Sequence, residues 1–224
     1  RGVESEGMIC AEDELGIGTS HEGIMVLPES AVPGTSAKDY LNLESDTVFE
    51  IGLTPNRVDA ASHIGVARDL YAYLKYHNYN VTMNLPSDSE FVAISQSATG
   101  LKPASVKVVA ADGSPRYMGL TMDSVTVAPS PEWLQKALRA VGLRPINNVV
   151  DVTNFILQET GHPLHAFDYD EIGGGEVVVR RALQGEKFVT LDGVERELSA
   201  EDLMICDTKK PMCLAGVFGG EKSG

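Results

Sequence analysis

The sequence has few cysteines, few basic residues and no long hydrophobic run. Its three cysteines are odd in number and sparse, which argues against the dense disulfide framework of a small secreted domain and favours a reducing compartment. No apolar stretch approaches the roughly 18 residues of a membrane-spanning helix, and the first residues do not have the pattern of a signal peptide. We therefore expect a cytoplasmic protein without a membrane partner.

Acidic residues outnumber basic ones in the chain as a whole. The chain has 18 Lys and Arg against 32 Asp and Glu, which gives a net charge of −14. Residues 1–50 alone carry eleven acidic and two basic side chains. A surface of this average charge repels phosphate, so wrapping of nucleic acid by most of the surface is disfavoured. The later part of the chain can still carry a local basic patch.

The remaining composition is that of a folded protein. Hydrophobic residues make up 43% of the 224 residues and charged residues 22%, which is enough apolar side chain to build one large domain or two modest ones. The chain begins at Arg1, without an initiator Met, and stops just after a glycine-rich loop. We expect it to be a fragment of a longer protein.

The hydrophobic pattern predicts strands followed by helices rather than a repeating strand–helix unit. Strands are expected at 47–53, 105–111 and 117–127, and a helix capped by Asp59 or Ser62 is expected to end near His77. Two more helices are expected, one from Ser130 to Gly142 and one from Asn148 to Gly161. This order favours the α+β class.

Smaller signals complete the expected fold. Trp133 is predicted to lie in the buried stripe of the 130–142 helix, and Val152 in that of the next helix. Asp192-Gly193 between two short apolar runs predicts a β-hairpin, and the three glycines at 173–175 predict a plain turn.

Two polar clusters set in apolar sequence could carry chemistry, namely residues 151–154 and 161–168. Thr153 and Asn154 are mediocre helix formers near the middle of an expected helix, so something other than helix propensity keeps them there. One interpretation is that they satisfy buried backbone groups of the next loop. The other is that the helix and loop present Asn154 and His165 to a small polar ligand. The residues alone leave both open.

Other kinds of site are poorly supported. His162 and His165 with Cys206 and Cys213 lack the two close pairs of a zinc site, so no metal is expected. No G-x-S-x-G elbow is present, so covalent catalysis is not supported. The glycine-rich loop at 216–220 is either a tight turn or a loop whose amides hold a ligand carboxylate or ester oxygen.

Five strings, in this order and spacing, resemble the β subunits of bacterial phenylalanyl-tRNA synthetases. They are 54–57 (TPNR), 62–68 (SHIGVAR), 142–154 (GLRPINNVVDVTN), 163–168 (PLHAFD) and 214–220 (LAGVFGG). The resemblance implies four parts: the end of an OB-like tRNA-binding module at 1–46, a small mixed N-terminal domain of B1 type at 47–85, a linker at 86–104, and the first part of a larger α+β B3/B4 editing domain at 105–224.

The resemblance also implies a function for the last part. In this family the B3/B4 domain hydrolyses tyrosine that has been wrongly attached to phenylalanine tRNA, within an enzyme that attaches phenylalanine to its tRNA. Its catalytic positions fall on His165 and Asn154. Its substrate-binding positions fall on Thr153, Pro163, Ala166, Gly219 and Gly220. An acidic residue that recognises the tyrosine hydroxyl lies beyond the end of this chain, so the isolated fragment is expected to be weak or inactive.

Partners and cofactors follow from the same resemblance. The implied partners are the α subunit, in a heterotetramer of two α and two β chains, phenylalanine tRNA, and tyrosine as editing ligand. No cofactor is expected in this fragment, whereas the whole enzyme would use ATP and magnesium. The alternative is that the fragment is a structural, tRNA-orienting scaffold without hydrolytic activity.

Overall fold

The computed structural model describes all residues except 1, 3, 5, 6, 19, 44, 45, 90, 93–99 and 222–224. The chain divides into two units, Arg1–Thr47 and Val48–Gly224, which we describe separately. The expected linker at 86–104 lies partly outside the described residues. The division of the later unit into domains at 47–85 and 105–224 remains a prediction.

The first unit consists mainly of turns. Its described helix is the single turn α1 (Ala37–Tyr40), and the Met25 amide donates a hydrogen bond to the Cys10 carbonyl across the turns (2.9 Å). Apolar side chains line a small concavity of about 120 Å³, among them Leu15, Met25, Leu27, Val32 and Tyr40. A unit with so little regular structure depends on such side-chain contacts for its order.

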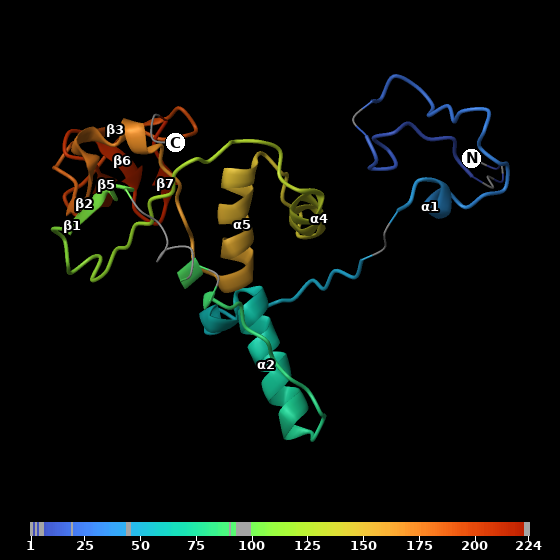
Figure 1. Ribbon diagram of the computed structural model, residues 1–224, viewed down its shortest axis with the longest axis horizontal. Helices are drawn as coiled ribbons and strands as arrows, with labels where there is room; N and C mark the ends of the chain where they lie inside the picture. The colour runs from blue at the N-terminus through green and yellow to red at the C-terminus, as the bar shows by residue number, and fades with distance from the viewer. Residues whose placement is uncertain are drawn as a thin grey trace. The chain divides into compact units, whose positions relative to one another are not determined.

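The described part of the second unit contains three longer helices, and a left-handed glycine follows two of them (Figure 1). Helix α2 (His63–Tyr76) begins at Ser62, whose hydroxyl accepts a hydrogen bond from the Gly65 amide (3.0 Å). Helix α4 (Glu132–Ala140) is followed by Gly142 in the left-handed region (φ 81°). Helix α5 (Asn148–Thr160) ends at Gly161, also left-handed (φ 77°). These stops confirm the expected helix ends.

The helix starts correct two expectations. Asn147, not Asn148, caps α5, because its side chain accepts from the amides of Val149 and Val150 (both 3.0 Å). Asn148 instead bonds residues 126 and 128 of the preceding segment. Ser130 does not cap α4 either, since its hydroxyl donates to the Asp151 carboxylate.

The buried faces of these helices also differ from the expected stripes. Leu134 and Leu138 are the fully buried residues of α4, whereas Trp133 is 61% exposed and contacts Phe155 edge-on. On α5 the buried residue is Asp151, and Val152 is 48% exposed. The 3.6-residue period predicted the helices correctly but placed the inward face wrongly.

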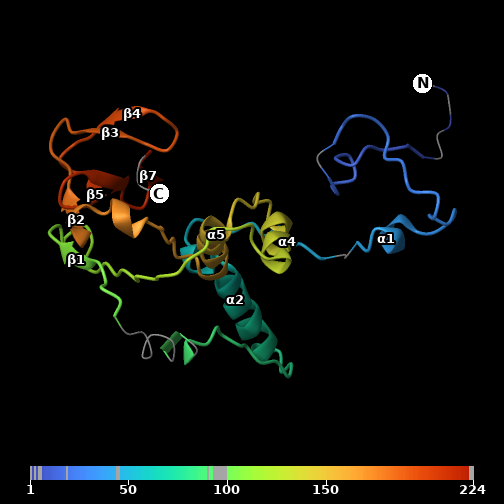
Figure 2. The same cartoon turned by 45° about the horizontal axis from the view of Figure 1, so that its top comes forward.

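A five-stranded mixed sheet forms the other part of this unit (Figure 2). Its order is β1 (Ser105–Val108), β2 (Glu176–Arg181), β5 (Leu203–Cys206), β6 (Pro211–Leu214) and β7 (Phe218–Gly219). Strands β1 and β2 are parallel and the other neighbours are antiparallel. Helices together with a mixed sheet confirm the α+β class.

Alternating side chains of the sheet enter two apolar clusters. Ile205 packs with one set of buried residues, while its neighbours Met204 and Cys206 pack with the other, as expected for the two faces of a strand. The first cluster also holds Ile172, Val177, Met212 and Cys213, and the second holds Ala182, Phe188 and Leu198.

The hairpin expected at Asp192-Gly193 is present as β3 (Lys187–Val189) and β4 (Glu195–Glu197). The short 3-10 turn at Gly173–Gly175 precedes β2, which confirms the expected turn.

Two expected strands, 47–53 and 117–127, are wrong: no ladder hydrogen bonds form there, and Phe49 (79% exposed) and Met122 (67% exposed) face solvent. Alternating apolar residues become a strand only where another edge is available to pair with them.

Candidate functional site

The first part of the candidate site lies on α5. Thr153 is held in the helix because its hydroxyl donates to the Val150 carbonyl one turn earlier (2.7 Å). Asn154 is half-buried, and none of the described residues forms a hydrogen bond with its side chain. The Thr153 hydroxyl is therefore used within its own helix and not by the following loop, and the Asn154 side chain has no hydrogen-bond partner among the described residues.

Asp151, in the same polar cluster, has a structural role. Its carboxylate is fully buried and accepts hydrogen bonds from the Ser130 hydroxyl (2.5 Å) and the Ile146 amide (2.8 Å). These bonds tie the start of α4 and the loop before α5 to the first turn of α5. A buried carboxylate needs such partners, because an unpaired charge there is costly.

The segment after α5 carries the second part of the site. Gly161 lies against the start of α2, where a Cβ would come 3.4 Å from the Ala61 carbonyl oxygen. From there the chain is extended through Pro163, His165 and Ala166, whose side chains remain exposed. The His165 ring packs against the ring of Phe167, with centroids 4.4 Å apart and planes tilted by 54°. Phe167 in turn packs on the first apolar cluster, which anchors this segment to the sheet.

The protein around His165 changes its titration. Desolvation lowers the pKa of His165 below its ordinary value of 6.5, although the ring keeps contact with solvent. The ring is therefore neutral at pH 7, with one nitrogen as donor and the other as acceptor. A neutral, accessible imidazole can accept a proton from water or orient it.

The third part is the hairpin formed by β6 and β7. Gly216 makes its turn with a left-handed backbone (φ 70°), so the 216–220 loop is a tight turn. The Gly220 amide donates to the Met212 carbonyl (2.8 Å), and the Gly219 carbonyl accepts from the Leu191 amide (3.0 Å). These two backbone groups are therefore already used in internal hydrogen bonds.

Both glycines are sites of close approach. A Cβ on Gly219 would lie 3.1 Å from Cε1 of His165 and 2.8 Å from Cδ1 of Leu191. A Cβ on Gly220 would lie 2.7 Å from the Met212 carbonyl oxygen and 2.8 Å from Cζ of Phe188. Gly219 therefore lets the His165 ring approach the backbone of β7, while Gly220 lets β7 pack on the sheet.

The structure thus brings together His165 and Gly219, 54 positions apart in the chain, with Gly220 next to them. It does not link Thr153 or Asn154 to His165 by any hydrogen bond or ring contact within the described ranges. Leu191 was not predicted as a neighbour of this site. The Asp192-Gly193 signal placed it at a hairpin turn, but no sequence pattern shows that this turn docks on β7.

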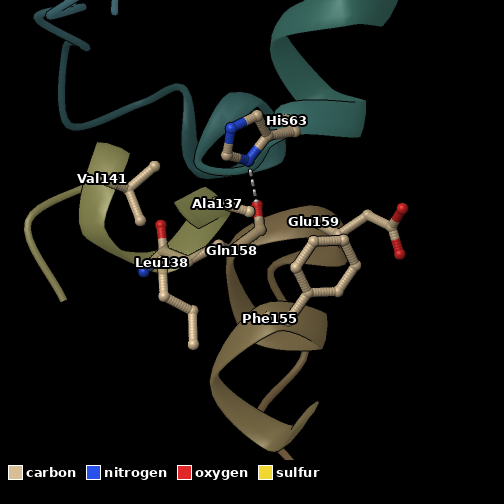
Figure 3. Close-up of a pocket in the computed structure, with 7 residues that line it drawn as sticks. All are labelled: His63, Ala137, Leu138, Val141, Phe155, Gln158 and Glu159. Carbon is tan, nitrogen blue, oxygen red and sulfur yellow. Dashed lines mark hydrogen bonds between the residues drawn. The ribbon is translucent and has the colours of Figure 1, made fainter. Parts of the chain in front are cut away.

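A cavity of the second unit lies elsewhere, between the start of α2 and helices α4 and α5 (Figure 3). It has a volume of about 180 Å³, and His63 Nδ1 bonds the Gln158 carbonyl oxygen at its edge (2.9 Å). Its other walls are Ala137, Leu138, Val141, Phe155 and Glu159. None of the residues predicted for ligand binding lines it.

Metal and thiol chemistry have little support in the described part of the chain. Among the described residues, Cys10, Cys206 and Cys213 form no disulfide, and Cys206 and Cys213 are buried. Over the described residues, no three His, Cys, Asp or Glu side chains are grouped so that they could hold a metal ion.

The helices described here are too short or too polar to cross a membrane.

Comparison of the sequence with known proteins identifies its family. The B3/4 domain family matches residues 113–224, which is half of the chain. Over all 224 residues the chain is 58% identical to the phenylalanine–tRNA ligase beta subunit of Bacteroides fragilis. It is 53% identical to that of Porphyromonas gingivalis over 225 aligned positions, and 50% identical to that of Geobacter metallireducens over 224. In each case the chain spans 27% of the relative's length. The resemblance carried by the five strings is confirmed, and the chain belongs to the B3/4 domain family.

Proposed function

We propose that this chain is part of the β subunit of a phenylalanine–tRNA ligase and that its B3/4 region removes tyrosine from wrongly charged phenylalanine tRNA. The observation that carries the proposal is the close approach of a neutral, solvent-accessible His165 ring to the backbone of Gly219. The identity to ligase β subunits over the whole chain supports the choice of substrate.

The proposed reaction is hydrolysis of an aminoacyl ester. Water adds to the ester carbonyl, the bond from this carbon to the ribose oxygen breaks, and tyrosine and the free ribose hydroxyl are released. His165 orients the water and accepts its proton, which passes to the leaving oxygen. Asn154 and Thr153 hold the amino acid from α5, and Pro163, Ala166, Gly219 and Gly220 shape the space around it. The ester is already activated, so positioning and stabilisation of the oxyanion are sufficient.

The physical reason for a second site is the small difference between tyrosine and phenylalanine. A synthetic site built for phenylalanine rejects the added hydroxyl incompletely, whereas an editing site with polar groups for that hydroxyl favours tyrosine. On this proposal the chain works in the cytoplasm in an assembly of two α and two β subunits. ATP and magnesium serve the attachment of phenylalanine by the whole enzyme. The described residues have no grouping that fits a metal, and no step above depends on one.

A scaffold role is the second candidate, because the Thr153 hydroxyl and the Gly220 amide are both used in internal hydrogen bonds. A scaffold would orient tRNA or the α subunit without hydrolysing the ester. The scaffold role does not require that the His165 imidazole be accessible to a ligand.

Deacylation separates the two candidates. Tyrosyl and phenylalanyl esters of phenylalanine tRNA are incubated with the 224-residue chain and with the complete β subunit assembled with α. We expect the assembled enzyme to release tyrosine preferentially and the short chain to be slower and less selective. His165→Ala in the assembled enzyme should slow the release about 100-fold. His162→Ala, which alters an exposed histidine three residues away, should not. Equal deacylation rates for His165→Ala and the parent would contradict the editing proposal and favour the scaffold role.

A further inference from the structure

Exposed aromatic side chains gather at the end of α2 and in the turn that follows it. Tyr73 is 60% exposed, Tyr76 83% and Tyr79 59%. Tyr73 and Tyr76 lie on one helical face and both contact the ring of His77, at centroid distances of 4.4 and 5.2 Å. Asn78 then turns the chain with a left-handed backbone (φ 63°), which brings the Tyr79 amide to the Leu74 carbonyl (2.9 Å). We call Tyr73, Tyr76, His77 and Tyr79 the aromatic cluster.

The aromatic cluster lies on the part of α2 that points away from the other helices of its unit. Figures 1 and 2 both show the first turn of α2 near α5, and the last turns projecting beyond it. The hydrogen bond from His63 to the Gln158 carbonyl fixes the first turn. The structure therefore presents the exposed rings on a supported helix.

The segment around the aromatic cluster is less acidic than the chain as a whole. Residues 51–87 carry three basic residues, Arg57, Arg68 and Lys75, against two acidic ones, and no acidic residue occurs from 70 to 87. Asp59 and Asp69 both pair with Arg57, at 3.0 and 2.6 Å. Lys75 lies over the Tyr71 ring at 5.7 Å and is exposed. This segment therefore repels an anion less than the average of a chain of net charge −14.

We infer that the aromatic cluster binds unpaired nucleotides of an RNA, with the rings stacking on bases and Lys75 near the phosphates. Exposed rings stack on any base, and a nearby cation neutralises the backbone, which is the usual arrangement of single-strand binding surfaces. The inference rests on the proposed function for the identity of the RNA, a tRNA, and assigns a contact surface outside the B3/4 region. The other possible occupant, a protein surface, would meet the same rings as apolar area.

Variants that keep or remove the aromatic ring at position 76 distinguish an RNA from a protein surface as the occupant. Binding of an uncharged phenylalanine tRNA transcript to the assembled enzyme is measured for the parent, Tyr76→Phe, Tyr76→Leu and Lys75→Ala. We expect Tyr76→Phe to bind as the parent does, and Tyr76→Leu, which keeps apolar volume without a ring, to bind roughly 5- to 150-fold more weakly. Lys75→Ala should reduce the slope of log affinity against log salt by about one. Phe49→Leu, at an exposed ring next to Glu50, is the matched control and should bind as the parent does.

The tRNA affinities expected for these variants do not depend on the editing activity. His165→Ala should leave tRNA affinity unchanged, so a failure of the deacylation experiment does not affect this one. A fully paired RNA duplex should show no difference between the parent and Tyr76→Leu, because paired bases do not offer their faces for stacking. Unchanged tRNA affinity in Tyr76→Leu would overturn the inference. So would weaker subunit assembly in Tyr76→Leu with tRNA affinity per assembled enzyme unchanged, since it would show that a protein surface covers the rings.

Discussion

His165 and Gly219 face each other so closely that a methyl group on Gly219 would lie 3.1 Å from Cε1 of the imidazole. The same methyl group would lie 2.8 Å from Cδ1 of Leu191. Three segments therefore meet at one backbone position: the extended chain after α5, strand β7 and the turn of the β3–β4 hairpin. The proposed editing chemistry depends on this meeting point.

Substitution by alanine should show which glycine matters for the position of His165 and which for packing of the sheet. Gly219→Ala should lower the free energy of unfolding by about 1–3 kcal/mol and displace His165, because side-chain ends can shift to make room. Gly220→Ala should cost more, since the nearest atom is the Met212 backbone oxygen at 2.7 Å. Urea denaturation measures both.

Gly52→Ala provides the control for this series, because no heavy atom lies within 4 Å of its added Cβ. Its unfolding free energy should stay within about 0.5 kcal/mol of the parent. A Gly219→Ala protein with the stability and deacylation rate of Gly52→Ala would contradict the close contact with His165.

Removal of the buried Asp151 carboxylate should destabilise the helical part of the second unit. Asp151→Ala leaves the Ser130 hydroxyl and the Ile146 amide without their acceptor, and we expect a loss of about 2–4 kcal/mol. Asp151→Asn keeps one acceptor oxygen and should lose less. Asp123→Ala, at an exposed aspartate, should change stability little. Thermal unfolding followed by circular dichroism tests this order of stabilities.

Acidification should reveal the lowered pKa of His165. The folded protein holds this ring neutral below the unfolded-state pKa of about 6.5, so the unfolded chain binds a proton first as the pH falls. The stability contributed by the neutral ring is complete above that value and decreases below it. The parent should therefore lose stability relative to His165→Gln between pH 7.5 and pH 5.5, as measured by urea denaturation at each pH. A constant difference would show that the ring titrates normally.

Thiol modification should separate the cysteines by burial. Burial raises the pKa of Cys206 to about 11, so little of this thiol is ionised at neutral pH. Cys213 is also buried, which limits access of a reagent to it. Cys10 is only partly covered. In the native protein we expect a disulfide reagent such as DTNB to modify Cys10 rapidly and the other two thiols only on unfolding. Rapid modification of all three in the folded state would contradict the packing of β5 and β6.

Local signals predicted much of the fold because they act within a few residues. Ser62 caps α2 through an amide three positions away, and Gly142 and Gly161 stop their helices by a left-handed backbone that other residues rarely adopt. The Asp192-Gly193 turn is equally local. Such interactions depend on neighbouring residues alone, so the sequence contains all the information they need.

Tertiary structure decided the features that depend on distant partners. Trp133 lies outside and Leu134 inside because of what packs on α4, and residues 117–127 remain without a strand because no sheet edge pairs with them in the described structure. The resemblance named His165 and Gly219 as site residues, but their contact depends on how an extended segment, a hairpin and strand β7 fold together. Apolar patterning indicates that a residue is buried, whereas the partner that buries it is determined only when the chain forms its long-range contacts.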